Sequence, residues 1–250
     1  MAPGSDTGEY AGHSAGVSDA GTTAGIVTSV RDRSEIYARI VAESFTPLGW
    51  FAALPRDGLP GDTQSVLLIG NAGPAMFQRF ARERNSERDQ LDDWTRETID
   101  RLAASLGASA VYPFGAPTYP FLRWAERSGA GRASPLGLSI HPVFGLWHAY
   151  RAALLLPTLF DGPASVSAVH PCDTCADKPC LTSCPVTAFH GAHYDVAACV
   201  GHLRSDSGQP CLSGGCLARR ACPVGQEYAY QPQQARFHMH AFLKSSEPFS

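Results

Sequence analysis

Eight cysteines carry the most specific chemistry of this sequence, and all of them lie between residues 172 and 222. Four fall close together in "PCDTCADKPCLTSCPV", with the spacing C-x2-C-x4-C-x3-C and a proline after the last. A region so rich in cysteine, glycine and proline cannot form an ordinary apolar core and needs a cross-link, for which a metal site is the candidate. The full set is Cys172, Cys175, Cys180, Cys184, Cys199, Cys211, Cys216 and Cys222.

Eight thiolates divide into two sets of four, the number of ligands that a 4Fe-4S cluster takes. In the bacterial ferredoxin run, three nearby cysteines hold one cluster and a fourth, before proline, ligates the other; here Cys184 and Cys222 both precede proline. The spacings depart from the standard run, but longer loops cost little closure entropy. We therefore predict two 4Fe-4S clusters. A structural zinc site is the alternative, and disulfides are not expected in a compartment that keeps thiols reduced.

The composition is that of an ordinary globular protein of 250 residues, long enough for one large domain or two modest ones. The formal net charge of −3 shows no excess of basic residues that would bind phosphates, so we expect no nucleic-acid partner. No apolar run approaches the length of a membrane-spanning helix, and no basic and apolar leader opens the chain. We therefore expect a cytoplasmic protein without a membrane partner.

Periodic patterns begin after a Gly-, Ala- and Ser-rich tail at 1–29 that has almost nothing to bury. Apolar spacing predicts alternating strands and helices in a first domain over 30–160, in which Ser34 would cap a helix and Pro74 would lie in a first helical turn. A cysteine-rich domain is expected over 165–230 and a C-terminal docking tail over 231–250. The expected helices span 34–45, 73–80 and 91–107, and the expected strands 65–70, 137–141 and 150–156.

The C-terminal tail contains "QARFHMHAFLKS", in which Phe237, Met239 and Phe242 are expected to pack against the rest of the protein. His238 and His240 would share a face if this stretch were extended, and that arrangement would suit a metal ion.

Residues 172–222 resemble the iron-sulfur domain of epoxyqueuosine reductases and related corrinoid-dependent reductases. Both have a four-cysteine run ending in Cys-Pro, a lone cysteine (Cys199 in "YDVAACVGHLRS") and a three-cysteine run ending in Cys-Pro. The resemblance implies two crossed ligand sets. With eight thiols present, the nearby His190, His193 and His202 are expected to tune a cluster by hydrogen bonding or to lie on the surface. The implied sets are Cys172, Cys175, Cys180 and Cys222 for one cluster, and Cys184, Cys199, Cys211 and Cys216 for the other.

A second resemblance covers about residues 45–157. "SIHPVFGLWHAYRAALLLP" (139–157), "GWFAAL" (49–54) and "GPAMFQRF" (73–80) are similar, in the same order, to segments of the cobalamin-processing proteins that remove upper ligands from the corrin. This resemblance implies an α+β fold of the flavin-reductase or nitroreductase kind, a mixed sheet with flanking helices, followed by a small ferredoxin-like domain with two clusters.

The second resemblance also implies a cofactor site for cobalamin, made by Arg151, His141, Trp147 and Phe144. Each has a structural alternative: Arg151 an ion pair at the sheet end, His141 a hydrogen-bonded turn, and the aromatic rings core packing. Tyr112 and Tyr119, in the loop 112–120, are candidates for an entrance.

Two features of these families are missing. The stretch "PTYPFLRWAERSG" has no histidine where the cobalamin processors carry one, and we find no counterpart of the aspartate that serves epoxyqueuosine reductases as general acid. No catalytic residue is therefore assigned, and a transfer-RNA substrate is not carried over.

The leading hypothesis is an iron-sulfur oxidoreductase, cobalamin-dependent or cobalamin-reducing, that passes electrons from an external donor to a corrinoid or small-molecule acceptor in the first domain. An electron carrier with a non-catalytic first domain and a zinc-stapled structural protein are the alternatives.

Overall fold

The structure is a computed structural model that describes residues 32–84, 90–161, 169–190 and 193–246. These residues fall in one compact unit, 31–250. The expected tail at 1–29 lies outside the described residues, as does most of the expected boundary between 160 and 165, so the domain limits stay a prediction. In the described ranges, no helix is both long enough and apolar enough to cross a membrane.

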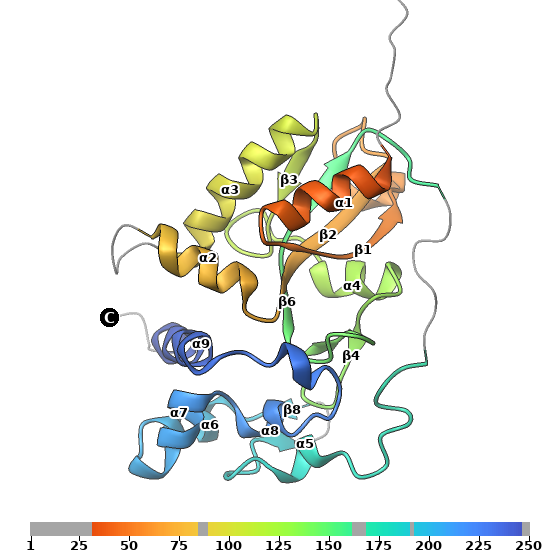
Figure 1. The fold of residues 1–250 in the computed structure, drawn as a ribbon. Coiled ribbons are helices and arrows are strands. Elements are labelled where there is room, and N and C mark those ends of the chain that lie inside the picture. The colour runs from red at the N-terminus through yellow and green to blue at the C-terminus, as the bar shows by residue number, and fades with distance from the viewer. Residues whose placement is uncertain (1–31, 85–89, 162–168, 191–192, 247–250) are drawn as a thin grey trace, which may run out of the picture. The chain divides into compact units, whose positions relative to one another are not determined.

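The central sheet has the strand order β1-β2-β6-β3, and every neighbouring pair is antiparallel (Figure 1). The expected α+β class is confirmed, but a mixed sheet is wrong for the described strands. Helices between β2 and β3 return the chain, so that these two strands run the same way; β6 then lies between them and opposes both. The strands are β1 (Thr46–Ala52), β2 (Ser65–Ala72), β3 (Ser109–Val111) and β6 (His148–Leu156).

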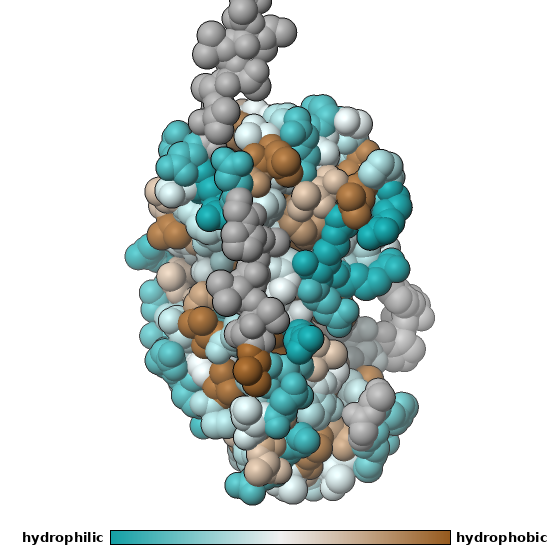
Figure 2. All heavy atoms as spheres, turned by 90° about the vertical axis from the view of Figure 1, so that its right-hand side faces the viewer, coloured by the Kyte–Doolittle hydropathy of each residue, from teal (hydrophilic) through white to brown (hydrophobic). Residues whose placement is uncertain are grey.

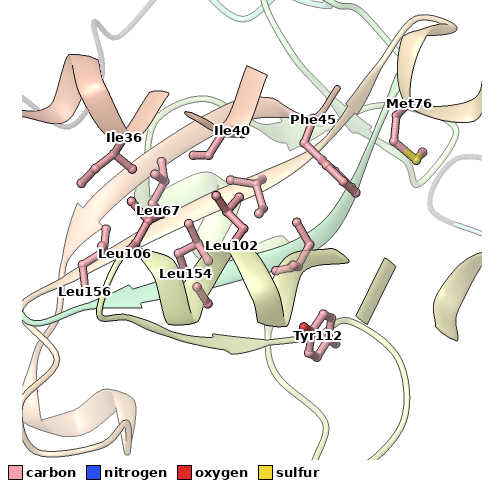
Figure 3. Close-up of a cluster of buried hydrophobic side chains, with 14 of the residues drawn as sticks. Ile36, Ile40, Phe45, Leu67, Met76, Leu102, Leu106, Tyr112, Leu154 and Leu156 are labelled. Carbon is pink, nitrogen blue, oxygen red and sulfur yellow. The ribbon is translucent and has the colours of Figure 1, made fainter. Parts of the chain in front are cut away.

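Three helices cover one face of the sheet and form the larger core: α1 (Arg33–Ala42), α2 (Ala75–Glu83) and α3 (Leu91–Ser105). Figure 3 shows Ile36 and Ile40 of α1 above Leu67 and Leu154 of the strands, with Leu102 of α3 beside them. Ile36 and Ile40 recur on one side of their helix because a turn takes 3.6 residues. Burying each such side chain contributes roughly 1.5–3 kcal/mol.

The opposite face is covered by the short helix α4 (Phe121–Arg127). Trp124 and Phe121 of α4 pack on Phe51 of β1 and Leu155 of β6 in a second buried cluster. Each strand therefore divides its alternate side chains between the two cores, as the twofold repeat of a strand requires. The 3-10 turn η1 (Pro55–Asp57) precedes the loop to β2.

The helices expected at 34–45, 73–80 and 91–107 are confirmed as α1, α2 and α3, and the strands at 65–70 and 150–156 as β2 and β6. Ser34 is not the N-cap, because the Asp32 side chain accepts a hydrogen bond from the Ser34 N–H at 3.0 Å and takes that role. Pro74 is the N-cap of α2 and not a first-turn residue.

The strand expected at 137–141 is wrong apart from its centre. Only Ser139–Ile140 is extended, as β5, and it pairs with β4 (Arg132–Ala133) apart from the central sheet.

The described residues between 169 and 230 form short helices, turns and one pair of short strands, and a longer helix, α9 (Pro232–Ser245), follows them. The extended alternative for His238 and His240 is therefore wrong. Phe237 of α9 packs on Phe77 and Phe80 of α2, with ring centroids 5.2 and 5.7 Å apart. The elements before α9 are α5 (Pro179–Thr182), β7 (Phe189–His190), β8 (His193–Tyr194), α6 (Val196–Leu203), η2 (Asp206–Gly208), α7 (Gln209–Gly214), α8 (Leu217–Arg220) and η3 (Gln226–Tyr228).

The surface turned to the viewer in Figure 2 carries hydrophobic residues in small, separate groups among hydrophilic ones. The described part of the chain exposes large apolar side chains on several different elements, among them Val41, Leu122 and Val196. Scattered residues of this kind are normal on a protein surface.

Candidate functional site

All eight cysteines are free thiols. Cys180, Cys211 and Cys222 are buried, and the other five are partly buried. A buried thiol is an inert small hydrophobe unless a metal or a nearby positive charge stabilises its thiolate. What these cysteines do therefore depends on how they are grouped.

The first thiol group consists of Cys172, Cys175, Cys180 and Cys222. Burial, and after it the charges of the other three members, raise the pKa of Cys172 to about 11. Burial also raises the pKa values of Cys180 and Cys222, and in both the charge of Cys175 adds to the effect. Cys172, Cys180 and Cys222 therefore resist ionisation unless a cation compensates.

The second thiol group consists of Cys184, Cys199, Cys211 and Cys216, which line one hollow together with Phe189, Leu203 and Met239. Burial raises the pKa values of Cys199 and Cys216, and the charge of Cys211 contributes to both. Tyr194 donates a hydrogen bond to Cys199, and burial together with that thiol raises the pKa of the phenol. Met239 belongs to α9, so the C-terminal helix closes part of this hollow.

Backbone N–H groups point at several of the sulfur atoms. The Ala188 N–H donates to Cys184 Sγ at 3.3 Å, and the N–H groups of Ala218 and Arg219 donate to Cys216. The Val224 N–H donates to Cys222, which lowers the pKa of that thiol against the effect of burial. Such donors stabilise negative charge on sulfur and, at iron-sulfur clusters, help to set the reduction potential.

The donor chemistry of both groups fits a 4Fe-4S cluster, which takes four thiolates and holds them apart by its own width. His202 lines the second hollow, and its Nε2 is buried without a hydrogen-bond partner among the described residues. Within those residues, no three His, Cys, Asp or Glu side chains are grouped to hold a single metal ion. The two groups are the sets that the resemblance implies, and cluster binding itself stays a prediction.

The first thiol group is joined to the sheet region by close backbone contact. Gly145 has φ +55° and Gly225 φ +70°, and a Cβ on Gly145 would overlap the Val224 carbonyl. A Cβ on Gly225 would overlap the backbone of Phe144. Only glycine allows two chains to approach so closely in this conformation. Cys180 and Cys222 share a buried cluster with Leu136, Ile140 and Leu146.

Two side chains strengthen this junction. Arg219 donates to the Leu146 carbonyl through Nε at 2.9 Å, and its guanidinium lies over the rings of Trp147 and Tyr230, 5.0 and 4.5 Å from their centroids. The His170 ring accepts the Cys172 N–H at Nδ1, so its Nε2 carries the proton and donates to the Ala133 carbonyl of β4. The cysteine region is therefore fixed to the turn before β6 and to β4.

The four residues expected at a cofactor site do not converge on one cavity. The His141 and Phe144 rings are 4.5 Å apart in the turn before β6. Trp147 is buried under Arg219, and Arg151 pairs with Asp92 of α3 at 2.5 Å and donates to Thr95. The ion-pair alternative thus describes Arg151 in this structure, and a cobalamin site made by these four residues stays a prediction.

His141 and His148 form a neutral pair beside this turn. The Nδ1 atom of His141 accepts the N–H groups of Val143 and Phe144, while Nδ1 of His148 faces the Gly145 carbonyl and therefore carries a proton. Burial lowers the pKa of His141 to about 4 and that of His148 to about 3, where the charge of His141 contributes as well. Neither ring carries a charge at neutral pH.

Another hollow lies beside α4, and the sequence predicted only part of its lining. It has a volume of about 470 Å³, and its lining includes Tyr119, Phe121, Arg123 and Tyr150. Of the two expected entrance residues, Tyr119 lines it, whereas Tyr112 is buried and donates to Asp100 at 2.6 Å. Tyr150 and Arg123 were missed because only the tertiary fold brings β6 and α4 together. We call this space the aromatic hollow.

No family model and no curated protein matches the chain. Among solved structures, an epoxyqueuosine reductase from Streptococcus thermophilus is 13% identical with a TM-score of 0.49, over 81% of this chain and 69% of that one. The C. elegans B12-trafficking protein CblC, a human MMACHC homologue, is 12% identical with a TM-score of 0.47, over 87% of this chain and 98% of that one. Both kinds of protein that the sequence motifs resemble are thus among the structural matches.

One comparison corrects an expectation. An epoxyqueuosine reductase solved with an epoxyqueuosine-modified tRNA-Tyr stem loop matches with 15% identity and a TM-score of 0.46, over 81% of this chain and 70% of that one. The expectation of no nucleic-acid partner is contradicted by this match and is withdrawn. It rested on the missing counterpart of the general-acid aspartate and on net charge, which says nothing of how charge is distributed over the surface.

Proposed function

We propose that the chain is an iron-sulfur oxidoreductase that passes electrons through two 4Fe-4S clusters to a corrinoid or small-molecule acceptor in its N-terminal region, 30–160. The observation that supports it is the grouping of eight free thiols into two sets of four, one of which packs against the turn before β6. In this proposal the N-terminal region has a flavin-reductase-like architecture and 165–230 is a ferredoxin-like module. The protein would work in a compartment that keeps thiols reduced, such as the cytoplasm.

The first thiol group would hold one cluster and the second thiol group the other. Bound clusters would supply one-electron transfer, which amino-acid side chains do not provide. The N–H donors to Cys184, Cys216 and Cys222 would stabilise negative charge at the sulfur atoms. Leu146 and Phe189 would exclude water, which strengthens electrostatic interactions around each group.

The aromatic hollow is our candidate for the acceptor site. Tyr119 and Tyr150 offer ring faces for a flat apolar body, and Arg123 offers a planar donor for a carboxylate or amide oxygen. Phe144 packs on the same core cluster as these two tyrosines, and the His141 ring lies against Phe144. Of the four residues expected to contact a cofactor, we therefore retain His141 and Phe144. Arg151 and Trp147 would instead position β6.

The test is anaerobic purification followed by iron and acid-labile sulfide counts for the wild type, Cys172→Ser and Cys199→Ser. We expect about eight irons in the wild type and about four in each variant, because each substitution removes a ligand from one group only. Colourless protein that holds zinc would contradict the proposal and support the zinc-stapled alternative.

Addition of cob(II)alamin then tests the acceptor. A shifted corrin spectrum that is lost in Tyr150→Ala, with the iron count unchanged, supports the reductase. An unchanged spectrum at full iron content supports the alternative, an electron carrier with a non-catalytic N-terminal region. The separate positions of the four expected cofactor residues also favour that alternative.

A further inference from the structure

A second hollow, lined by residues of α7, α8 and α9, lies next to the second thiol group. Its volume is about 540 Å³, and we call it the basic hollow. Gly214, which lines it, stands between Cys211 and Cys216 in the chain, and the Arg220 guanidinium lies directly over this glycine. The full lining is Trp147, Ser213, Gly214, Arg220, Gln226, Ala229, Tyr230, Pro232 and Arg236.

The charge of this hollow is positive and uncompensated. Arg220 and Arg236 are exposed, and neither guanidinium has an acidic partner among the described residues; none of the lining residues is acidic. Residues 196–246 contain five Lys or Arg against two Asp or Glu, whereas the whole chain has 20 against 23. The basic excess is therefore concentrated beside the second thiol group.

The two guanidinium groups at this hollow, which have no acidic partner among the described residues, are suited to bind carboxylates. Each guanidinium can donate two parallel hydrogen bonds to one carboxylate. A nucleic acid is a poorer fit to this hollow. Proteins bind nucleic acids tightly through many phosphate contacts or through aromatic rings on which bases stack. In this hollow the rings of Trp147 and Tyr230 are already covered by the Arg219 guanidinium. The chemistry therefore favours an acidic protein surface over a strand of RNA.

We propose that the basic hollow is the docking site of an acidic one-electron carrier protein, whose carboxylates are received by Arg220 and Arg236. This inference rests on the proposed function, because a cluster exchanges single electrons and its donor must be a one-electron carrier. The second thiol group is then the one that faces the donor, since Gly214 and the Arg220 guanidinium lie between it and the partner. Opposite charges would also steer the encounter and make it depend on salt.

The experiment measures binding of an acidic [2Fe-2S] ferredoxin, used as the probe, to the anaerobically purified full chain. Wild type is compared with R220E/R236E, with the neutral R220Q/R236Q, and with the control R56E/R82E. Arg56 in η1 and Arg82 in α2 are exposed and without partners among the described residues, so the control changes the net charge equally. Thermal melting and the iron count are recorded on every sample.

We expect R220E/R236E to weaken binding at low salt by about tenfold or more, R220Q/R236Q by less, and the control by no more than about twofold. Wild-type binding should fall between about 20 and 300 mM salt, as screening shortens the reach of surface charge. An equal loss of ferredoxin affinity in R220E/R236E and in the control overturns the docking site. It is also overturned if the protein binds a tRNA stem loop but not ferredoxin, and if that binding is weakened by the changes at Arg220 and Arg236. The iron count reports separately on the proposed function, because a chain without iron fails that proposal whatever it binds.

Discussion

The contact between Gly145 and the loop after Cys222 allows a sharp test of how the two regions are joined. Gly145 has a left-handed backbone, and a Cβ at this position would overlap the Val224 carbonyl and lie 3.3 Å from the Val224 Cβ. Gly107, which follows α3, has a similar φ of +62° and nothing within 4 Å of its would-be Cβ. Gly107→Ala therefore carries the backbone strain alone, and Gly145→Ala carries the strain and the overlap.

The two costs can be separated in magnitude. A left-handed conformation costs an alanine about 1 kcal/mol relative to glycine, and forcing atoms into a filled contact adds about 2 kcal/mol. In a chain of this size about 3 °C of Tm corresponds to 1 kcal/mol. We therefore expect Gly107→Ala to lower Tm by about 3 °C and Gly145→Ala by about 9 °C.

The assay is thermal melting of the anaerobically purified variants, followed by circular dichroism and accompanied by an iron count. In Gly145→Ala the overlap pushes away the loop that carries Cys222, so iron bound by the first thiol group should be lost before the protein unfolds. Equal Tm values for the two variants would refute the contact and with it the close junction described here.

Two further predictions concern the same junction. Arg219→Ala removes the contacts with the Trp147 and Tyr230 rings and a charged hydrogen bond, and should cost about 3 kcal/mol in urea unfolding. The Arg220 side chain is exposed and has no ion-pair partner among the described residues, so Arg220→Ala should cost less than about 0.5 kcal/mol. Equal costs would contradict the stacking of Arg219. Burial holds the pKa of His148 at about 3, below its ordinary value near 6.5. Between these two pH values the unfolded chain binds a proton at this ring that the folded chain does not. The contribution of His148 to stability is therefore complete above about pH 6.5 and falls as the pH drops toward about 3. His148→Gln should reduce the slope of unfolding free energy against pH between about 5 and 6.5, and an unchanged slope would argue against a neutral buried ring.

The sequence predicted elements wherever a local pattern was strong. The helix α3 was found because its buried residues recur at helical spacing behind two acidic residues, and β2 because it is continuously apolar. The strand β1 was missed, since Pro47 and Gly49 interrupt it and its register shifts between Pro47 and Trp50. The helix α4 was missed because only seven residues separate a proline-rich loop from a glycine-rich one.

Type and spacing were enough to single out the cysteines as candidate cluster ligands, a role that stays a prediction, but they could not reveal the surroundings of the thiols. Which N–H groups reach the sulfur atoms, and that Met239 of α9 closes the second hollow, depends on contacts between distant parts of the chain. Arg151 shows the opposite problem: a motif suggested a ligand contact, and Asp92, 59 residues away, takes the guanidinium instead. Tertiary pairing of this kind leaves no trace in a local pattern.

The two thiol groups interleave along the chain, and this has a consequence for biosynthesis. Cys222, the last cysteine of the sequence, belongs to the group that begins first, while the second group is complete at Cys216. As the chain leaves the ribosome, the group that starts later therefore acquires its full set of thiols earlier. A chain cut between these two cysteines would retain one complete group and three orphaned thiols of the other.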